Sequence, residues 1–162
     1  MKMKDKKIAI ASDPAGFPLK EALRTYLEQA EYPYVDLGTR NTKEPVNYIE
    51  AASNVARVVS EKEADFGVVC CGTGMGVSIV ANKHKGVYCA LVESEWAAHE
   101  ARNLNDANVI AMGNRIVAPA MACDILKVFL ETPFAEGASE ERKRMLEAFL
   151  EKLFAEENVN MR

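Results

Sequence analysis

The sequence predicts an α/β fold, in which short strands and amphipathic helices alternate along 162 residues. Short apolar segments recur through the chain, and each is followed by a longer segment with apolar residues at helical spacing. A hydrophobic content of 49% is enough to bury one full core. Repeated strand–helix units with right-handed crossovers build an open sheet between two helix layers. The expected class is therefore a Rossmann-like three-layer α-β-α fold with a five-stranded parallel sheet.

The individual elements follow from the same patterns. Strands are expected at short apolar runs, as in sheets covered on both faces, at residues 7–12, 33–37, 65–71, 87–92 and 108–112. Helices are expected at the amphipathic segments that follow, at residues 17–30, 47–62, 76–84, 94–104 and 117–131.

A final charged helix is expected over about residues 139–156, after the sheet is complete. Its apolar residues recur at helical spacing and form a stripe of Met145, Leu146, Phe149, Leu150, Leu153 and Phe154. The stripe could pack on its own domain or on a second subunit, and we expect the second. The chain is otherwise predicted to form a single domain spanning residues 1–162.

Charge and cysteine content restrict the partners and the compartment. The formal net charge of -4 provides no general attraction to nucleic acid or to anionic membranes, so neither is an expected partner. The four cysteines contain no C-x-x-C pair and are interpreted as reduced thiols of a cytoplasmic protein.

The segment from Cys71 to Gly76 is the most informative for chemistry. It reads Cys-Gly-Thr-Gly-Met-Gly and joins the third expected strand to the helix that follows. Backbone N–H groups and the positive end of the helix dipole favour an anion at such a turn, whether phosphate, carboxylate or a transient oxyanion. The same field favours the thiolate form of Cys71, whereas Cys70 should point to the opposite face as a small hydrophobe. A base beside an anion hole suggests proton abstraction next to a carbonyl.

A nucleotide site is the competing interpretation of these glycines. The spacing Gly72-x-Gly74-x-Gly76 departs from the dinucleotide pattern G-x-G-x-x-G, and it follows the third strand instead of the first. Glu93, at the end of the next strand, could still mimic a ribose-binding acid. The glycine spacing alone leaves both interpretations open.

Motifs spread along nearly the whole chain resemble the RpiB/LacAB family of sugar-phosphate isomerases. In order, they are Ser12-Asp13-x-Ala15-Gly16, Asp36-x-Gly38-Thr39, the segment 71–83, Asn105-Asp106-Ala107-Asn108-Val109 and Gly113-x-Arg115. The resemblance implies aldose–ketose isomerisation through a cis-enediolate, as for ribose 5-phosphate in pentose phosphate metabolism. It further implies that no metal or other cofactor is needed, and that homodimers or homotetramers share residues between their active sites.

The resemblance also implies catalytic roles. Cys71 would be the base that moves a proton between C1 and C2, and Thr73 would shuttle or orient the proton between the two substrate oxygens. The side chain of Asn105 and the backbone amides of the turn would stabilise the enediolate. Asp13 would hold the sugar hydroxyls. As alternatives, Asp13 could be only a turn residue and Asn105 only a hydrogen-bonding loop residue.

Substrate-binding roles are implied for a further set, in which the turn supplies backbone amides, an aromatic ring forms a wall and two arginines bind the substrate. These residues are Gly72, Gly74, Met75, Gly76, Tyr48, Arg115 and Arg142. Tyr48 could alternatively be only a core aromatic residue.

Several positions depart from the family's pattern. Pro14 stands where pentose-phosphate members have a histidine, and Leu104 where they have the ring-opening histidine. Ala138 and Ser139 replace an Arg-His pair, which leaves Arg142 as the remaining cation. His84, expected at a helix end, and His99, expected within a helix, lie at other positions.

These departures favour a particular substrate class. A four-carbon sugar phosphorylated on its last oxygen has no hydroxyl left to form a furanose, so it needs no ring-opening acid. Leu104 therefore fits a tetrose or tetrulose phosphate, within the wider expectation of a ribose-5-phosphate-type or related C4–C6 sugar phosphate. The alternatives are an unphosphorylated or longer sugar held by Arg40, Arg115 and Arg142, a non-catalytic sugar-phosphate-binding homologue, and one subunit of a heteromeric galactose-6-phosphate isomerase.

Overall fold

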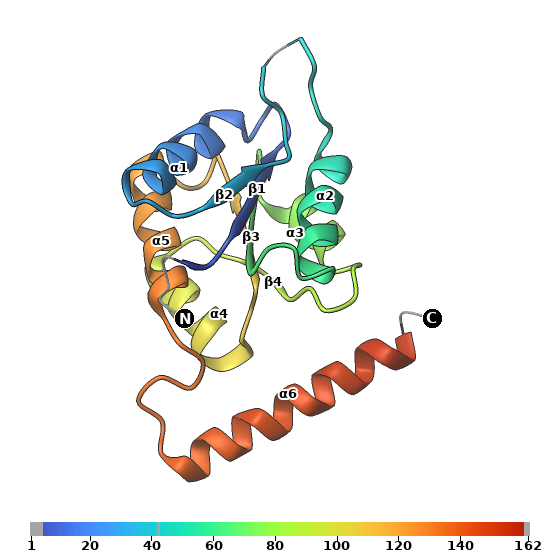
Figure 1. The fold of residues 1–162 in the computed structure, drawn as a ribbon, viewed down its shortest axis with the longest axis vertical. Coiled ribbons are helices and arrows are strands. Elements are labelled where there is room, and N and C mark those ends of the chain that lie inside the picture. Colours follow the sequence, from blue (N-terminus) through green and yellow to red (C-terminus); the bar gives the residue numbers. More distant parts are fainter. Residues whose placement is uncertain (1–4, 42, 161–162) are drawn as a thin grey trace.

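A computed structural model describes residues 5–41 and 43–160 and confirms the predicted α/β class (Figure 1). Its strands form one parallel sheet in the order β2-β1-β3-β5-β4. The strands are β1 (Ile8–Ser12), β2 (Tyr34–Asp36), β3 (Phe66–Cys71), β4 (Cys89–Leu91) and β5 (Val109–Gly113). The strand order reverses direction between β1 and β3. The carboxyl ends of these two strands therefore mark the switch point, where open α/β sheets bind ligands.

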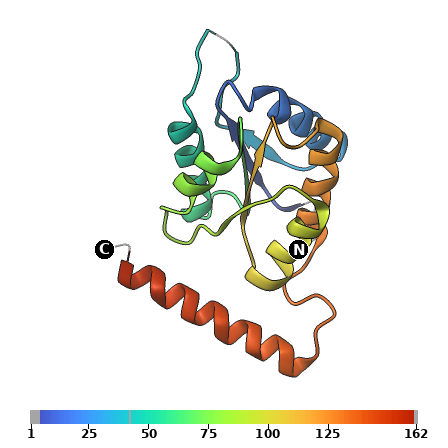
Figure 2. The same cartoon turned by 180° about the vertical axis from the view of Figure 1, so that it is seen from behind.

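Helices cover both faces of the sheet (Figures 1 and 2). One face carries α1 (Phe17–Gln29), α4 (Glu95–Asn105) and α5 (Pro119–Glu131). The opposite face carries α2 (Tyr48–Ser60) and α3 (Met75–Ala81). The three layers predicted from the sequence are thus present.

The alternation of side chains along the strands separates two cores of different character. In β1, Ile8 and Ile10 face α1 and α5, whereas Ala9 and Ala11 face α2. The small side chains on the second face let α2 approach the sheet closely. The same alternation places Cys70 in the first core and Cys71 in the second, as predicted.

The third helix is shorter than expected, because a side chain ends it. α3 stops at Ala81, and the amide group of Asn82 then bonds both backbone groups of Cys89 in β4. Asn82 Nδ2 donates to the Cys89 carbonyl and Asn82 Oδ1 accepts the Cys89 N–H, each at 2.8 Å. The prediction that His84 ends a helix is therefore wrong, since His84 lies in the turn between α3 and β4.

The last helix, α6 (Glu140–Asn160), extends beyond its predicted end and lies apart from the two helix layers (Figures 1 and 2). It reaches the body of the molecule through buried Leu146 and through Phe154, whose ring centroid lies 5.1 Å from that of Tyr88. Met145, Phe149 and Leu153 are exposed in the single chain. The domain thus covers the apolar stripe only in part: Leu146 is buried, Phe154 is 38% exposed, and Leu153 is 43% exposed although it borders a surface pocket with Tyr88. Within the described residues, no helix has the length and apolar character needed to cross a membrane.

Candidate active site

The Cys71 turn lies at the switch point between β1 and β3, at the carboxyl end of β3. The Cys71 side chain is 7% exposed, and its Sγ accepts the N–H of Gly74 at 3.1 Å. Thr73 Oγ1 accepts a long hydrogen bond from the N–H of Met75 at 3.4 Å. The turn therefore aims a backbone donor at the sulfur and keeps the Thr73 hydroxyl beside the first residue of α3.

Two glycines permit this turn because it packs backbone against backbone. Gly74 has a φ of 78°, which L-residues rarely adopt, and a β-carbon there would stand 2.6 Å from Leu91 Cδ1. A β-carbon on Gly113, at the end of β5, would stand 2.5 Å from the carbonyl carbon of Thr73. Larger residues at either position would push the turn away from the sheet.

The loop after β1 packs on the same turn. A β-carbon on Gly16 would stand 2.6 Å from the backbone nitrogen of Cys71. Asp13 Oδ1 accepts the N–H of Gly16 at 2.8 Å, so Asp13 has the local turn role considered as an alternative. Its Oδ2 has no hydrogen-bond partner within residues 5–41 and 43–160 and remains available to a ligand.

Tyr48 and Arg115 border the turn from two other elements. Tyr48 begins α2 and is 43% exposed, so the interpretation as a core aromatic is wrong. Its ring faces Gly76, where a β-carbon would stand 3.0 Å from Tyr48 Cε2. The Arg115 N–H donates to the Gly72 carbonyl at 3.0 Å, and Arg115 Nε lies 3.7 Å from the place of a β-carbon on Gly72. An aromatic wall and a cation thus flank the turn.

Asn105 and Arg142 lie at the other edge of the sheet in this chain. Asn105 is the last residue of α4, which runs from the carboxyl edge back to the amino edge, and it borders a surface pocket with Tyr88 and Leu153. Arg142 is exposed near the start of α6, which follows the amino edge (Figure 1). A single copy therefore does not bring either side chain to its own Cys71.

A small cavity beside Asp13 was not predicted from the sequence. It has a volume of about 240 Å³ and is lined by Pro14, Phe17, Thr39 and Pro45. The motif Asp36-x-Gly38-Thr39 could have indicated this cavity, because it places Thr39 after β2, the strand next to β1. The family's histidine position, occupied by Pro14, therefore lines an apolar cavity here.

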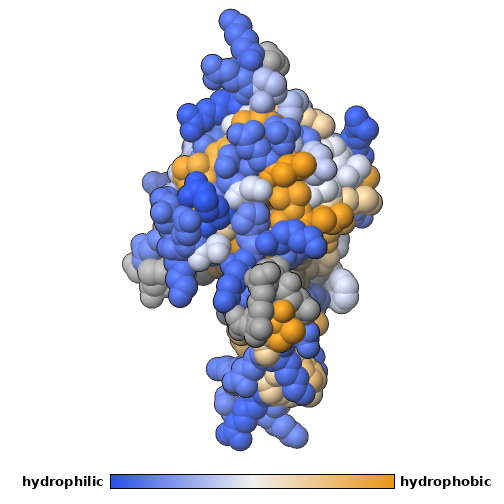
Figure 3. All heavy atoms as spheres, turned by 90° about the vertical axis from the view of Figure 1, so that its right-hand side faces the viewer, coloured by the Kyte–Doolittle hydropathy of each residue, from blue (hydrophilic) through white to orange (hydrophobic). Residues whose placement is uncertain are grey.

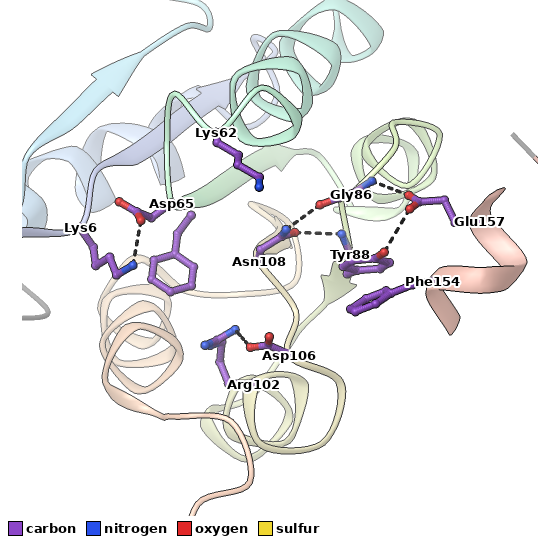
Figure 4. Close-up of a pocket in the computed structure, with 11 residues that line it drawn as sticks. Lys6, Lys62, Asp65, Gly86, Tyr88, Arg102, Asp106, Asn108, Phe154 and Glu157 are labelled. Atoms are coloured by element: carbon purple, nitrogen blue, oxygen red, sulfur yellow. Dashed lines mark hydrogen bonds and ion pairs between the residues drawn. The ribbon is translucent and has the colours of Figure 1, made fainter. Parts of the chain in front are cut away.

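Another cavity lies at the amino edge, away from Cys71 (Figure 4). It has a volume of about 600 Å³, and ion pairs line it. Lys6 Nζ lies 2.8 Å from Asp65 Oδ1, and Arg102 Nη1 lies 2.7 Å from Asp106 Oδ1. Lys62 and Glu157 also line it, so cations and carboxylates are mixed in this cavity and it has no concentrated positive charge for a sugar phosphate.

Two thiols and one imidazole outside the turn have shifted pKa values. Burial raises the pKa of the Cys70 thiol far above its usual range and raises the pKa of Cys89 to about 12. Hydrogen bonds to Glu136 and Glu100 raise the pKa of His99, at 2.9 Å and 2.7 Å respectively. Among the described residues, no group of three or more His, Cys, Asp or Glu side chains could hold a metal ion.

Comparisons with known proteins agree with this architecture. The family model described as Ribose/Galactose Isomerase matches residues 8–159. A 4-deoxy-4-sulfo-D-erythrose isomerase of Clostridium sp. (strain MSTE9) is 40% identical over 94% of this chain and 97% of its own length. A D-erythrulose-4-phosphate isomerase of Pectobacterium atrosepticum is 35% identical over 82% of this chain and 87% of its own length.

A solved structure supports the same relationship. Ribose-5-phosphate isomerase B of Clostridium thermocellum superposes with a TM-score of 0.84 at 35% identity, over 94% of this chain and 97% of the other. Both the length of these matches and their agreement in fold exclude a resemblance limited to one motif. The chain therefore belongs to the ribose/galactose isomerase (RpiB/LacAB) family of sugar-phosphate isomerases.

Proposed function

We propose that this enzyme interconverts an aldose and a ketose of four carbons that carry a terminal anion, with Cys71 as the base. The observation that carries the proposal is the Cys71 sulfur at the switch point, 3.1 Å from the Gly74 amide and next to the loop that holds Asp13. A thiolate there can reach a carbon-bound proton, while the turn presents N–H groups to the oxygen on which charge develops.

The proposed reaction passes through a cis-enediolate. The Cys71 thiolate removes the proton from C2 of the aldose, and the electrons of the C–H bond form the C1–C2 double bond as the carbonyl oxygen becomes an oxyanion. The amides of residues 72–76 stabilise that oxyanion. Thr73 passes a proton between the two substrate oxygens, and Cys71 returns its proton to C1. Asp13 and Tyr48 hold and enclose the sugar, and the steps use amino-acid groups alone, without a metal or other cofactor.

A second copy of the chain completes the site in this proposal. Asn105 and Arg142 lie at the wrong edge to serve their own Cys71, so they would serve the site of a homodimeric partner. Arg142, Met145 and Phe149 recur at helical spacing and share one face of α6. Exposed apolar side chains, including Ile49, Met75 and Ile79, also lie on the side of the molecule that carries α2 and α3 (Figure 3). Burial of these faces would favour dimerisation.

The substrate follows from the departures at Pro14 and Leu104. A sugar with phosphate or sulfonate on its fourth carbon cannot close a furanose, so it needs no acid at Leu104. Two relatives are named for four-carbon sugars with such groups. Because a sulfonate carries one charge and a phosphate carries up to two, the reduced set of cations favours the sulfonate. We therefore expect a tetrose bearing a terminal sulfonate to be the preferred substrate.

A substrate panel tests the proposal. Wild type and Cys71→Ala are assayed with 4-deoxy-4-sulfo-D-erythrose, D-erythrose 4-phosphate, D-ribose 5-phosphate and D-galactose 6-phosphate, with deuterium exchange at C1 and C2 followed in D₂O. We expect fastest turnover of the sulfonated tetrose and exchange that depends on Cys71. Preference for ribose 5-phosphate would refute the four-carbon assignment. Binding without exchange would indicate a non-catalytic homologue, and full turnover by this chain alone would exclude a heteromeric isomerase.

The cytoplasm is the compartment that fits this proposal. Cys70, Cys71, Cys89 and Cys123 are all free thiols in the structure. A base that works as a thiolate must stay reduced, and a reducing compartment keeps it so.

A further inference from the structure

Lys20 is an unusually placed lysine, because its side chain is entirely buried near the start of α1. Its Nζ contacts Asp36 Oδ2, lies 3.1 Å from Glu21 Oε1 and lies 5.2 Å from the centre of the Phe17 ring. Removing two charges from water is costly, and a buried ion pair adds little net stability compared with apolar residues of similar volume. The role of this pair is therefore better judged from the segments that it connects than from its contribution to the free energy of unfolding.

On one side, the pair fixes the loop after β2. Asp36 ends β2, and its Oδ1 accepts the N–H of Gly38 at 3.1 Å. Gly38 packs so closely on β1 that a β-carbon there would stand 2.3 Å from the Ser12 nitrogen. The N–H of Thr39 then donates to the Ser12 carbonyl at 2.9 Å. Asp36 thus holds the β2 loop against the end of β1.

On the other side, Lys20 is joined to the loop after β1 through the backbone of the first turn of α1. The backbone N–H of Lys20 donates to the Gly16 carbonyl at 3.0 Å, and Gly16 in turn donates to Asp13 Oδ1 at 2.8 Å. Gly16 is also the residue that packs on the backbone of Cys71. Lys20 therefore belongs to the same short segment as the carboxylate proposed to hold the sugar.

The cavity beside Asp13 has one wall from each of these loops. Pro14 and Phe17 come from the loop after β1 and the start of α1, and Thr39 and Pro45 come from the segment after β2. Phe17 contacts the Lys20 ammonium group, whereas Thr39 follows the glycine bound by Asp36. Both walls are thus connected to the same ion pair.

We propose that the Lys20–Asp36 ion pair is a positioning device that ties the β1 and β2 loops together and so sets the Asp13 carboxylate and the adjacent cavity for the substrate. This inference rests on the proposed function, in which Asp13 holds the sugar. Lys20 is buried and does not touch the substrate, so it is a positioning residue. Loss of the pair should weaken binding of the sugar, while the Cys71 turn stays in place because it packs against Gly113 at the end of β5.

The test compares Lys20→Met and Asp36→Asn with wild type in the full chain. Lys6→Met is the matched control, because it breaks the Lys6–Asp65 pair at the opposite edge of the sheet (Figure 4). For Lys20→Met we expect KM for the preferred sugar of the panel to rise by about 10-fold or more, with kcat changed by less than about 3-fold. Asp36→Asn keeps an acceptor for Gly38 and should show a smaller rise. Lys6→Met should leave both constants within about 2-fold.

Amide hydrogen exchange provides a readout independent of turnover. In Lys20→Met, exchange should accelerate at the amides of Gly16, Gly38 and Thr39 and stay unchanged in β5 and α5. Faster exchange throughout the domain, or an unchanged KM in a folded variant, would overturn the proposal. If Lys20→Met does not fold, the double variant Lys20→Met/Asp36→Leu, which buries no unpaired charge, decides by the same two criteria. If wild type turns over no sugar of the panel, the proposed function fails, and local exchange alone still decides whether the pair ties the loops.

Discussion

Two adjacent thiols at the end of β3 have opposite surroundings. Cys70 is fully buried in the core between the sheet and α1, and burial raises its pKa. Cys71 faces the opposite layer and meets the Gly74 amide. We expect Cys71→Ala to lower kcat by about 10²- to 10⁴-fold, the range of a lost general base, while unfolding by denaturant stays cooperative. Steady-state kinetics and a denaturation curve measure both quantities.

Cys70→Ala serves as the control for that substitution. Removing one buried sulfur leaves a small cavity, so the midpoint of denaturation should fall slightly while kcat changes by less than about 3-fold. An equal loss of turnover in both variants would mean that packing near β3, and not a thiolate, limits the reaction.

At the residue scale, the sequence identified the turn but not all of its surroundings. The period of two along a strand was enough to separate Cys70 from Cys71. The glycine spacing could not decide between nucleotide and sugar, and motif order along the chain was needed for that. The exposed position of Tyr48 against Gly76 depends on how α2 approaches α3, which is a tertiary contact with no local signal.

Among the elements, α4 is tied to the segment that leads to α6 by a histidine between two carboxylates. His99 lies 2.9 Å from Glu136 and 2.7 Å from Glu100, and these hydrogen bonds raise its pKa above the ordinary value of 6.5. A raised pKa in the folded state stabilises the fold below the ordinary pKa, and this stabilisation is lost as pH rises through the raised pKa. The free energy of unfolding should therefore fall over that window.

NMR titration of the His99 imidazole, together with urea denaturation at several pH values, checks this expectation. Glu136→Gln should lower the pKa of His99, and His99→Gln should remove the corresponding fall in stability. An imidazole that titrates at or below 6.5 in wild type would contradict the assigned contacts.

Element boundaries were predictable where they depend on local pattern and not where they depend on distant contacts. The end of α3 depends on Asn82 reaching Cys89, which lies on another element. The place of Asn105 followed from topology, because a crossover helix returns the chain to the amino edge of a parallel sheet. The sequence therefore contained the information that Asn105 cannot meet its own Cys71.

For the whole molecule, the exposed face of α6 is the clearest indication of assembly. Met145 and Phe149 lie on that face, and they are 44% and 55% exposed in the single chain. If a second copy covers the face, Phe149→Asp should convert dimers to monomers and reduce kcat/KM by at least about 10-fold, since a charge would be buried in the interface. Sedimentation velocity and kinetics at matched concentrations measure the two effects.

Ala155→Asp is the matched control, because it introduces the same charge at an exposed position of α6 outside that face. This substitution should leave both the sedimenting mass of the assembly and kcat/KM unchanged. A Phe149→Asp protein that keeps the wild-type mass and activity would show that the exposed face of α6 is not the interface.

The global architecture could be predicted further than the site. Alternating strand and helix patterns predicted the sheet, its layers and the edge at which ligands bind. They could not predict the cavity beside Pro14, because it arises between loops whose distance is set by Lys20 and Asp36. The sequence also could not show which residues of the α6 stripe its own domain covers, since all are apolar and only tertiary contacts distinguish buried Leu146 from exposed Phe149.

The amide group of Asn82 has a consequence for how copies of the chain can associate. By satisfying both outward-facing backbone groups of Cys89, it masks part of the open edge of β4, a strand of three residues. Uncovered edges invite pairing with another sheet. A second molecule is therefore hindered from extending the sheet at β4 by backbone pairing, and removing this amide would leave the backbone groups of Cys89 open to such pairing.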